Sequence, residues 1–334
     1  MFRINTGAVR SGARVTGAMV AGGALALGVA SGAALAQAWP NKPIRMVIPV
    51  AVGGASDTMA RIVAERITPR LGQTVIVDNK PGGNSQIGAA YVLAQPADGY
   101  TLLESNSVMT LRTAQPKSPY DMRTDFTQVM QIGVGTYVIY VNANLPVRNV
   151  RELFQYGRAN PGKLNLASVG NGTATHLAIE LLAQVGNFKM VHVPYAGSST
   201  SIPAVVAGQA DGGVDGWALI KGNVEAGRLR ALGVTAAKRI DILPEIPGME
   251  EAGVNNYDVK FWIGFSVKKG TPKEATDRLS REIGAVLADA QVKASIRNLG
   301  TSVTALPGEE LAKVVDQEVT MWSDVIKSAN IKLD

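Results

Sequence analysis

The chain has 334 residues, of which 46% are hydrophobic, and it carries no cysteine and a formal net charge of +6. This composition excludes a disulfide-rich secreted domain, and the mild, scattered positive charge with few aromatic residues excludes a nucleic-acid-binding protein. Two histidines and no cysteine argue against a zinc site, so we expect no metal site. We also expect no cofactor.

The N-terminal segment has the three parts of a secretory signal peptide. A basic start with Arg3, Arg10 and Arg14 is followed by an apolar run and by a small-residue A-x-A end. We expect cleavage of residues 1–36 near Ala36 and a periplasmic mature protein. A membrane anchor is the alternative, but the segment is only moderately apolar and lacks a stop-transfer pattern. No later stretch approaches the roughly 18 apolar residues that span a bilayer.

Strand and helix patterns then alternate in the first half of the mature chain. In order, the hydrophobic periodicity predicts a strand, a helix, a strand, a helix and a strand at Ile44–Pro49, Asp57–Arg70, Thr74–Asp78, about Ile87–Ala94 and Tyr100–Glu104. A βαβαβ order is typical of a parallel sheet with helices on both faces.

The pattern restarts after Phe126. Predicted strands are Tyr137–Val141, Leu164–Ser168, Met190–Pro194, Leu229–Thr235 and Val259–Val267. Predicted helices are Asn149–Ala159, Thr173–Val185, Ser198–Ala207, Pro272–Leu287 and Gly308–Ala329. We therefore predict one lobe from residues 39–138 and 257–334 and a second lobe from residues 139–256. The chain would cross between the lobes twice, and two crossings form a hinge that can close on a ligand.

Two turns combine glycines with the start of a helix. The first runs from Gly53 to Asp57, and the second runs from Ser168 to Thr173. Glycine allows positive φ and a close approach of the backbone to a ligand. The unpaired N–H groups of a helix start favour an anion such as a carboxylate or phosphate. One such turn in each half predicts a ligand held between the two lobes.

An ordered series of short motifs along the mature chain resembles the Bug-type (TctC-like) proteins, the solute-binding components of tripartite tricarboxylate transporters. The series includes Gly53-Gly54, Asn79-Lys80-Pro81-Gly82, Ala97-Asp98-Gly99-Tyr100, Gly170-Asn171-Gly172-Thr173, His192-Val193-Pro194-Tyr195 and Gly270-Thr271-Pro272. No single motif is diagnostic, but the ordered set is specific. The sequence departs from the family pattern at Val50-Ala51-Val52, at Ser105–Arg112 and at Gly213–Trp217.

The resemblance implies a two-lobed type II periplasmic-binding-protein (Venus flytrap) fold of the α/β class, each lobe a mainly parallel sheet flanked by helices. It implies capture of a small organic carboxylate and its delivery to the membrane permease subunits of a tripartite transporter. It also implies that backbone amides, hydroxyls and bridging waters grip the ligand carboxylate. We expect a monomer that is neither an enzyme nor embedded in the membrane.

The candidate ligand-binding residues follow the predicted strands. They are Gly53, Gly54, Ala55, Ser56, Asp57, Asn84, Ser85, Gln86, Ser105, Asn106, Ser107, Ser168, Gly170, Asn171, Gly172, Thr173, His176, Gly197, Ser198, Ser199 and Asp215.

Four acidic or basic side chains near these turns have more specific expected roles. We expect Asp57 to be a helix N-cap that shapes its loop, since a carboxylate would repel an anionic ligand. His176 either packs in the core with a backbone hydrogen bond or contacts the ligand, and His192 is expected to be structural. Asp215 would recognise a hydroxyl or ammonium group.

Three other functions have some basis in the sequence. A secreted hydrolase would use Ser168 or Ser56, but neither lies in the G-x-S-x-G pattern of a nucleophile elbow. A nucleotide-binding protein would need G-x-G-x-x-G and a downstream acidic residue, which are absent. An extracytoplasmic sensor accessory that binds a solute and docks on a signalling protein remains open.

Overall fold

The computed structural model describes residues 39–331, so the predicted signal peptide and its cleavage site lie outside the described residues. The first elements in chain order are β1 (Ile44–Ile48), α1 (Ala55–Leu71), β2 (Val75–Asn79), α2 (Gln86–Leu93), β3 (Thr101–Asn106) and α3 (Ser107–Ala114). Strand β1 lies between β2 and β3 and pairs with both in parallel. This order is the predicted βαβαβ unit, with the short helix α3 added.

The middle of the chain repeats the arrangement. It holds β4 (Phe126–Asn142), α4 (Val150–Ala159), β5 (Leu164–Ser168), α5 (Ala174–Gly186), β6 (Met190–Pro194), α6 (Ser198–Val206), β7 (Gly212–Gly216), α7 (Trp217–Glu225) and β8 (Leu229–Val234). Strand β5 pairs in parallel with β6 and with β7. We call the part built around β1 to β3 the first lobe and the part built around β5 to β8 the second lobe.

The last elements return to the first lobe. They are β9 (Lys260–Lys268), α8 (Lys273–Ala288), α9 (Ala290–Arg297), β10 (Ser302–Pro307) and α10 (Gly308–Ser328). Strand β9 pairs antiparallel with β3, and β10 pairs antiparallel with β4. The predicted parallel strands thus form the outer part of each lobe's sheet, and their pairing with antiparallel strands makes both sheets mixed rather than mainly parallel.

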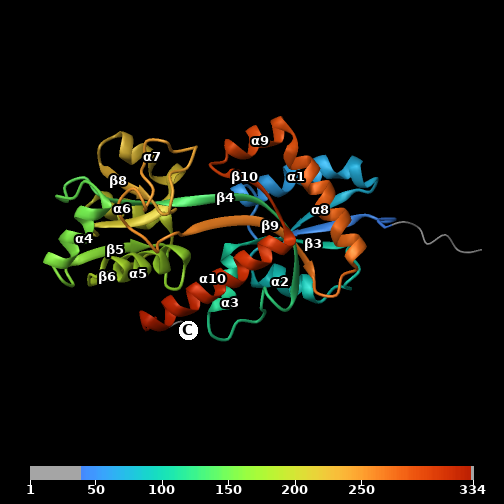
Figure 1. Ribbon diagram of the computed structural model, residues 1–334, viewed down its shortest axis with the longest axis horizontal. Helices are drawn as coiled ribbons and strands as arrows, with labels where there is room; N and C mark the ends of the chain where they lie inside the picture. The colour runs from blue at the N-terminus through green and yellow to red at the C-terminus, as the bar shows by residue number, and fades with distance from the viewer. Residues whose placement is uncertain (1–38, 332–334) are drawn as a thin grey trace, which may run out of the picture. The chain divides into compact units, whose positions relative to one another are not determined.

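Strand β4 belongs to both lobes (Figure 1). Its first half pairs with β9 and β10, and its second half pairs with β7 and β8. It therefore makes the first predicted crossing as one continuous strand, although the sequence predicted only its last part as a strand. The second crossing leads from β8 into β9.

The two crossings are joined by threonine hydroxyls. Thr136 Oγ1 lies 2.8 Å from Thr235 Oγ1, and Thr235 Oγ1 donates to the Val259 carbonyl at 2.6 Å. One residue earlier, Gly135 packs under the Phe261 ring, where a Cβ atom would lie 2.1 Å from the ring. A larger residue at this point of close approach would require the Phe261 ring to move. The crossings are thus packed and hydrogen-bonded together rather than being loose linkers.

Helix α10 contacts the cores of both lobes. Leu311, Val315 and Val319 pack with apolar residues of the first lobe, including Leu103. Closer to the C-terminus of α10, Trp322, Val325 and Ile326 pack with second-lobe residues, including Leu177 and Leu182. The predicted lobe boundaries stay predictions, but the helix that they assign to the first lobe spans both. None of the helices in residues 39–331 is long and apolar enough to cross a membrane.

Candidate functional site

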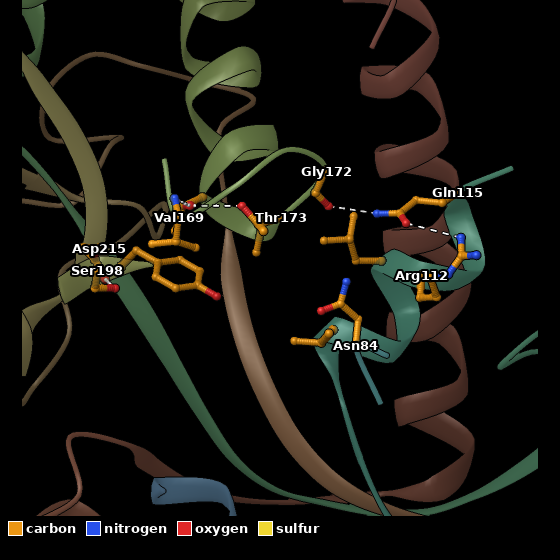
Figure 2. A pocket seen from close by; sticks show the side chains of 13 residues that line it. Asn84, Arg112, Gln115, Val169, Gly172, Thr173, Ser198 and Asp215 are labelled. Carbon is orange, nitrogen blue, oxygen red and sulfur yellow. Dashed lines mark hydrogen bonds between the residues drawn. The ribbon is translucent and has the colours of Figure 1, made fainter. Parts of the chain in front are cut away.

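A cavity of about 300 Å³ lies between elements of the two lobes (Figure 2). The lining residues from the first lobe are Asn84, Val108, Leu111, Arg112 and Gln115. Those from β4 and the second lobe are Tyr137, Val169, Gly172, Thr173, Ala174, Thr175, Ser198 and Asp215. Its walls are largely apolar with a few polar groups, which is the usual character of a small-molecule site.

Helix α3 supplies most of the first-lobe wall. Its start is capped by Asn106, whose side chain accepts a hydrogen bond from the Val108 N–H at 3.1 Å. Val108, Leu111 and Arg112 follow at i, i+3 and i+4 on one helix face, and Gln115 is the C-cap residue of the same helix. That face borders the cavity.

Arg112 brings a positive charge to the cavity. Its N–H groups donate to the Gln115 side chain at 3.3 Å and to the carbonyls of Pro116 and Lys117 at 3.3 and 3.1 Å. No carboxylate among the described residues lies within ion-pair distance of it. Since guanidinium is always charged and has five donors, Arg112 can still bind an anion.

The glycine turn before α5 forms the facing wall. Gly170 and Gly172 have φ of +135° and +69°, a region that side chains other than glycine disfavour. Thr173 caps the helix: its Oγ1 donates to the Gly170 carbonyl at 2.7 Å and accepts from the His176 N–H at 3.4 Å. The turn thus presents a helix N-terminus to the cavity, as the sequence predicted.

One side chain links the two walls. Gln115 Nε2 donates to the Gly172 carbonyl at 2.8 Å, shown by a dashed line in Figure 2. The first lobe is therefore hydrogen-bonded to the glycine turn of the second.

The two histidines contact this turn on the side away from the cavity lining. His176 Nδ1 accepts from the Gly172 N–H at 3.0 Å, which is the backbone-bonded alternative of the sequence analysis. The His192 ring stacks on that of His176 at 3.7 Å between centroids, and His192 Nε2 lies 2.7 Å from Ser168 Oγ. Ser168 is buried. These groups shape the turn rather than line the cavity.

Asp215 lines the cavity from the end of β7. It is 4% exposed, and its Oδ1 accepts from Ser198 Oγ at 3.1 Å and from the Gly216 N–H at 2.9 Å. Burial raises the pKa of the Asp215 carboxyl above its ordinary value, and the two hydrogen bonds oppose that rise.

Five predicted site residues line the cavity: Asn84, Gly172, Thr173, Ser198 and Asp215. The other predicted residues of the second lobe lie around it. Ser168, Gly170, Asn171 and His176 belong to the turn or its support, while Gly197 and Ser199 flank Ser198 at the start of α6. The ligand role of all these residues stays a prediction.

The glycine turn before α1 does not line the cavity. Gly53, Gly54 and Ala55 are exposed to solvent. Asp57 is not the N-cap, because α1 begins at Ala55 with Gly54 as its cap. The Asp57 carboxylate instead accepts from the Gly53 N–H at 3.0 Å, so it shapes the loop as expected.

Beneath that turn lies a buried carboxylate. Ser56 Oγ donates to Glu104 Oε1, and Asn106 Nδ2 lies 3.3 Å from both Glu104 oxygens. Burial raises the pKa of Glu104 to about 7 despite these hydrogen bonds. The side chains of Ser56 and Asn106 thus form hydrogen bonds within the first lobe.

The other predicted first-lobe residues are also held by the protein. The Ser105 hydroxyl is bonded to Ser266 at 2.7 Å, and Ser107 Oγ accepts from the Trp262 N–H at 3.3 Å. Ser85, which has φ of +70°, is buried, and Gln86 starts α2. These residues build the edge that carries Asn84 and α3.

Sequence reasoning missed the α3 face and Tyr137. The signals for α3 were present: Asn106 as a cap, followed by apolar residues three apart. They were weak because α3 has eight residues and includes three β-branched ones, which lower helix propensity. Tyr137 gave no signal of its own, since its position depends on how β4 crosses between the lobes.

The environment of His192 leads to a testable pH dependence. Burial, with the neighbouring His176, lowers its pKa to about 4. Because the unfolded chain binds this proton near pH 6.5, the stabilisation from neutral His192 is complete above 6.5 and is lost as pH falls toward 4. We expect His192→Gln to lose more stability relative to wild type at pH 7.5 than at pH 4.5 in urea titrations. Titration of Glu104 changes the stability with pH in the opposite direction, and it does so in both proteins. The measured quantity is therefore the difference in free energy of unfolding between wild type and variant. An equal loss at both pH values would contradict the assignment.

Comparisons with known proteins agree on one family. The profile of the tripartite tricarboxylate transporter family receptor matches residues 59–331. A UPF0065 protein in the tcbD-tcbE intergenic region of Pseudomonas sp. (strain P51) is 38% identical over 291 residues, covering 86% of this chain and 87% of the relative. The periplasmic binding protein BugD is 31% identical with a TM-score of 0.68, covering 88% of this chain and 99% of that structure. R. palustris Rpa4515 with adipate is also 31% identical, with a TM-score of 0.72 and the same coverage.

Proposed function

The chain belongs to the tripartite tricarboxylate transporter receptor family, and from this premise we propose that it is a periplasmic solute-binding protein that captures a small organic carboxylate between its lobes. In this proposal it delivers the ligand, as a monomer, to the membrane permease subunits of a tripartite transporter. The export pattern of residues 1–36 supports the location. The adipate in the Rpa4515 structure supports the ligand class.

The observation that carries the proposal is the pairing of Arg112 with the helix start at Thr173 across one cavity. Each is a donor to anions, and they come from opposite lobes. A carboxylate bound to both would hold the lobes together. A hydrogen bond to a charged group contributes about 1.5–3 kcal/mol, so four or five of them, less ordering costs, account for micromolar affinity.

We also propose that the protein binds without catalysis. Ser168, the most plausible nucleophile by its His192 partner, is 1% exposed and its hydroxyl is engaged with the Gly170 backbone. A nucleophile must reach its substrate, so the burial and hydrogen bonding of this hydroxyl argue against a catalytic role for Ser168.

The test is a thermal-shift panel of mono-, di- and tricarboxylates on the mature chain, followed by calorimetry on the hits. A ligand at 100 times its Kd stabilises the folded state by about 2.7 kcal/mol, which a melting curve detects. For the best hit, we expect Arg112→Gln to weaken binding by about 10- to 100-fold.

Arg123→Gln is the matched control. Arg123 pairs with Asp121 at 2.7 Å and does not line this cavity, so its loss should leave affinity unchanged. The proposal fails if no carboxylate at millimolar concentration raises the melting temperature.

A further inference from the structure

One carboxylate oxygen of Asp215, a residue that lines the cavity, has no hydrogen-bond partner among residues 39–331. Asp215 Oδ1 accepts two hydrogen bonds, but Asp215 Oδ2 is buried and accepts none from the described residues. Buried polar atoms in native proteins nearly always have a partner, whether protein, water or ligand. Since Asp215 lines the cavity, a bound molecule can supply the missing donor.

The cavity therefore has two chemically different ends. In Figure 2, Asp215 and Ser198 lie at one end, and Arg112 and Gln115 lie at the other, with Thr173 and Gly172 between them. The Arg112 end offers cationic donors. The Asp215 end offers an acceptor, and Ser198 Oγ already donates to it.

The cavity also has apolar lining. Val108, Leu111, Val169 and Ala174 contribute to it together with the Tyr137 ring. Side chains of this kind favour a hydrocarbon or aromatic body over a polar one.

We propose that the ligand is a monocarboxylate with an apolar body and a hydroxyl or ammonium donor at its far end, and that Asp215 Oδ2 accepts from that donor. This inference rests on the proposed function, because it takes carboxylate binding at the Arg112 end as given. A dicarboxylate would place a second anion against the Asp215 carboxylate, and like charges at short range repel. The preferred ligand thus differs in chemical class from the adipate in the Rpa4515 structure.

The test compares ligands that differ only at the far end. Calorimetry on the mature chain would use hexanoate, 6-hydroxyhexanoate, 6-aminohexanoate and adipate, with benzoate and 4-hydroxybenzoate as a rigid pair. A site built to accept a donor rejects the analogue that lacks it. We expect a hydroxy or amino acid to bind about 10- to 100-fold more tightly than its unsubstituted partner, and more tightly than adipate.

Asp215→Asn separates the role of this oxygen from that of the cavity as a whole. This variant should bring the ratio of affinities between substituted and unsubstituted acids close to one, while the unsubstituted acids keep their affinity. Asp211→Asn is the matched control: Asp211 lies in the same lobe, accepts from the Asn165 N–H at 2.7 Å and does not line the cavity. It should leave the ratio unchanged.

The outcomes are distinguishable. If unsubstituted acids or adipate bind as tightly as the hydroxy and amino acids in both series, the role of Asp215 is overturned while the proposed function stands. If none of the acids binds, the proposed function itself fails. A larger effect of Asp215→Asn on the amino than on the hydroxy acid identifies an ammonium as the preferred donor. The wild-type ratios stand even if the variant does not fold.

Discussion

Replacing Ala174 with tryptophan should abolish carboxylate binding while the protein stays folded. Ala174 is the first residue of α5, is only partly buried and lines the cavity. An indole ring at this position would fill much of a space of about 300 Å³, at the start of α5. We expect affinity for the best ligand to fall by about 100-fold or more, measured by calorimetry.

Two matched variants control for the change. Ala174→Ser keeps the side chain small and should bind like wild type. Ala218→Trp adds the same ring at an exposed position of α7, in the same lobe and outside the cavity, and should also bind normally. Wild-type affinity in Ala174→Trp would show that the ligand binds elsewhere.

The second large effect concerns stability. Trp322 is 3% exposed and lies in the part of α10 that packs with Leu177 and Leu182 of the second lobe. Truncating a buried tryptophan to alanine loses apolar burial and leaves a cavity, so Trp322→Ala should lower the free energy of unfolding by about 3–5 kcal/mol. Urea titration followed by circular dichroism measures it.

The comparison for this variant is a less buried tryptophan of the second lobe. Trp217 begins α7 and is partly exposed, so Trp217→Ala should cost less than Trp322→Ala. Trp322→Phe, which retains most of the volume, should recover part of the loss. If Trp322→Ala cost no more than Trp217→Ala, the packing of α10 on the second lobe would not contribute to stability.

The predicted fold is confirmed: the structure and its relatives have the two-lobed α/β architecture of periplasmic binding proteins. This could be read from the sequence because each strand and helix of the βαβ units carries its own periodicity, and glycines mark the turns. The turn at Gly170 and Gly172 was predictable for the same local reason.

Other features depend on contacts between distant segments, which local patterns do not encode. The turn at Gly53 has the same sequence character as the one at Gly172, yet it is exposed, because its position relative to the cavity is set by how the lobes are joined. Arg112 faces the cavity only because α3 packs between β9 and α10. The mixed sheets arise because β9 pairs with β3 and β10 pairs with β4. The local sequence of these strands does not predict which strand each one pairs with.

The route of the chain also bears on how the protein folds. Strand β3 pairs with β9 at Leu102 and Val267, more than 150 positions apart, whereas β5 and β6 pair within one βαβ unit. Contacts between remote segments carry a loop-closure cost and slow folding. We therefore expect the sheet of the first lobe to be completed only when β9 pairs with β3, and the second lobe to form earlier.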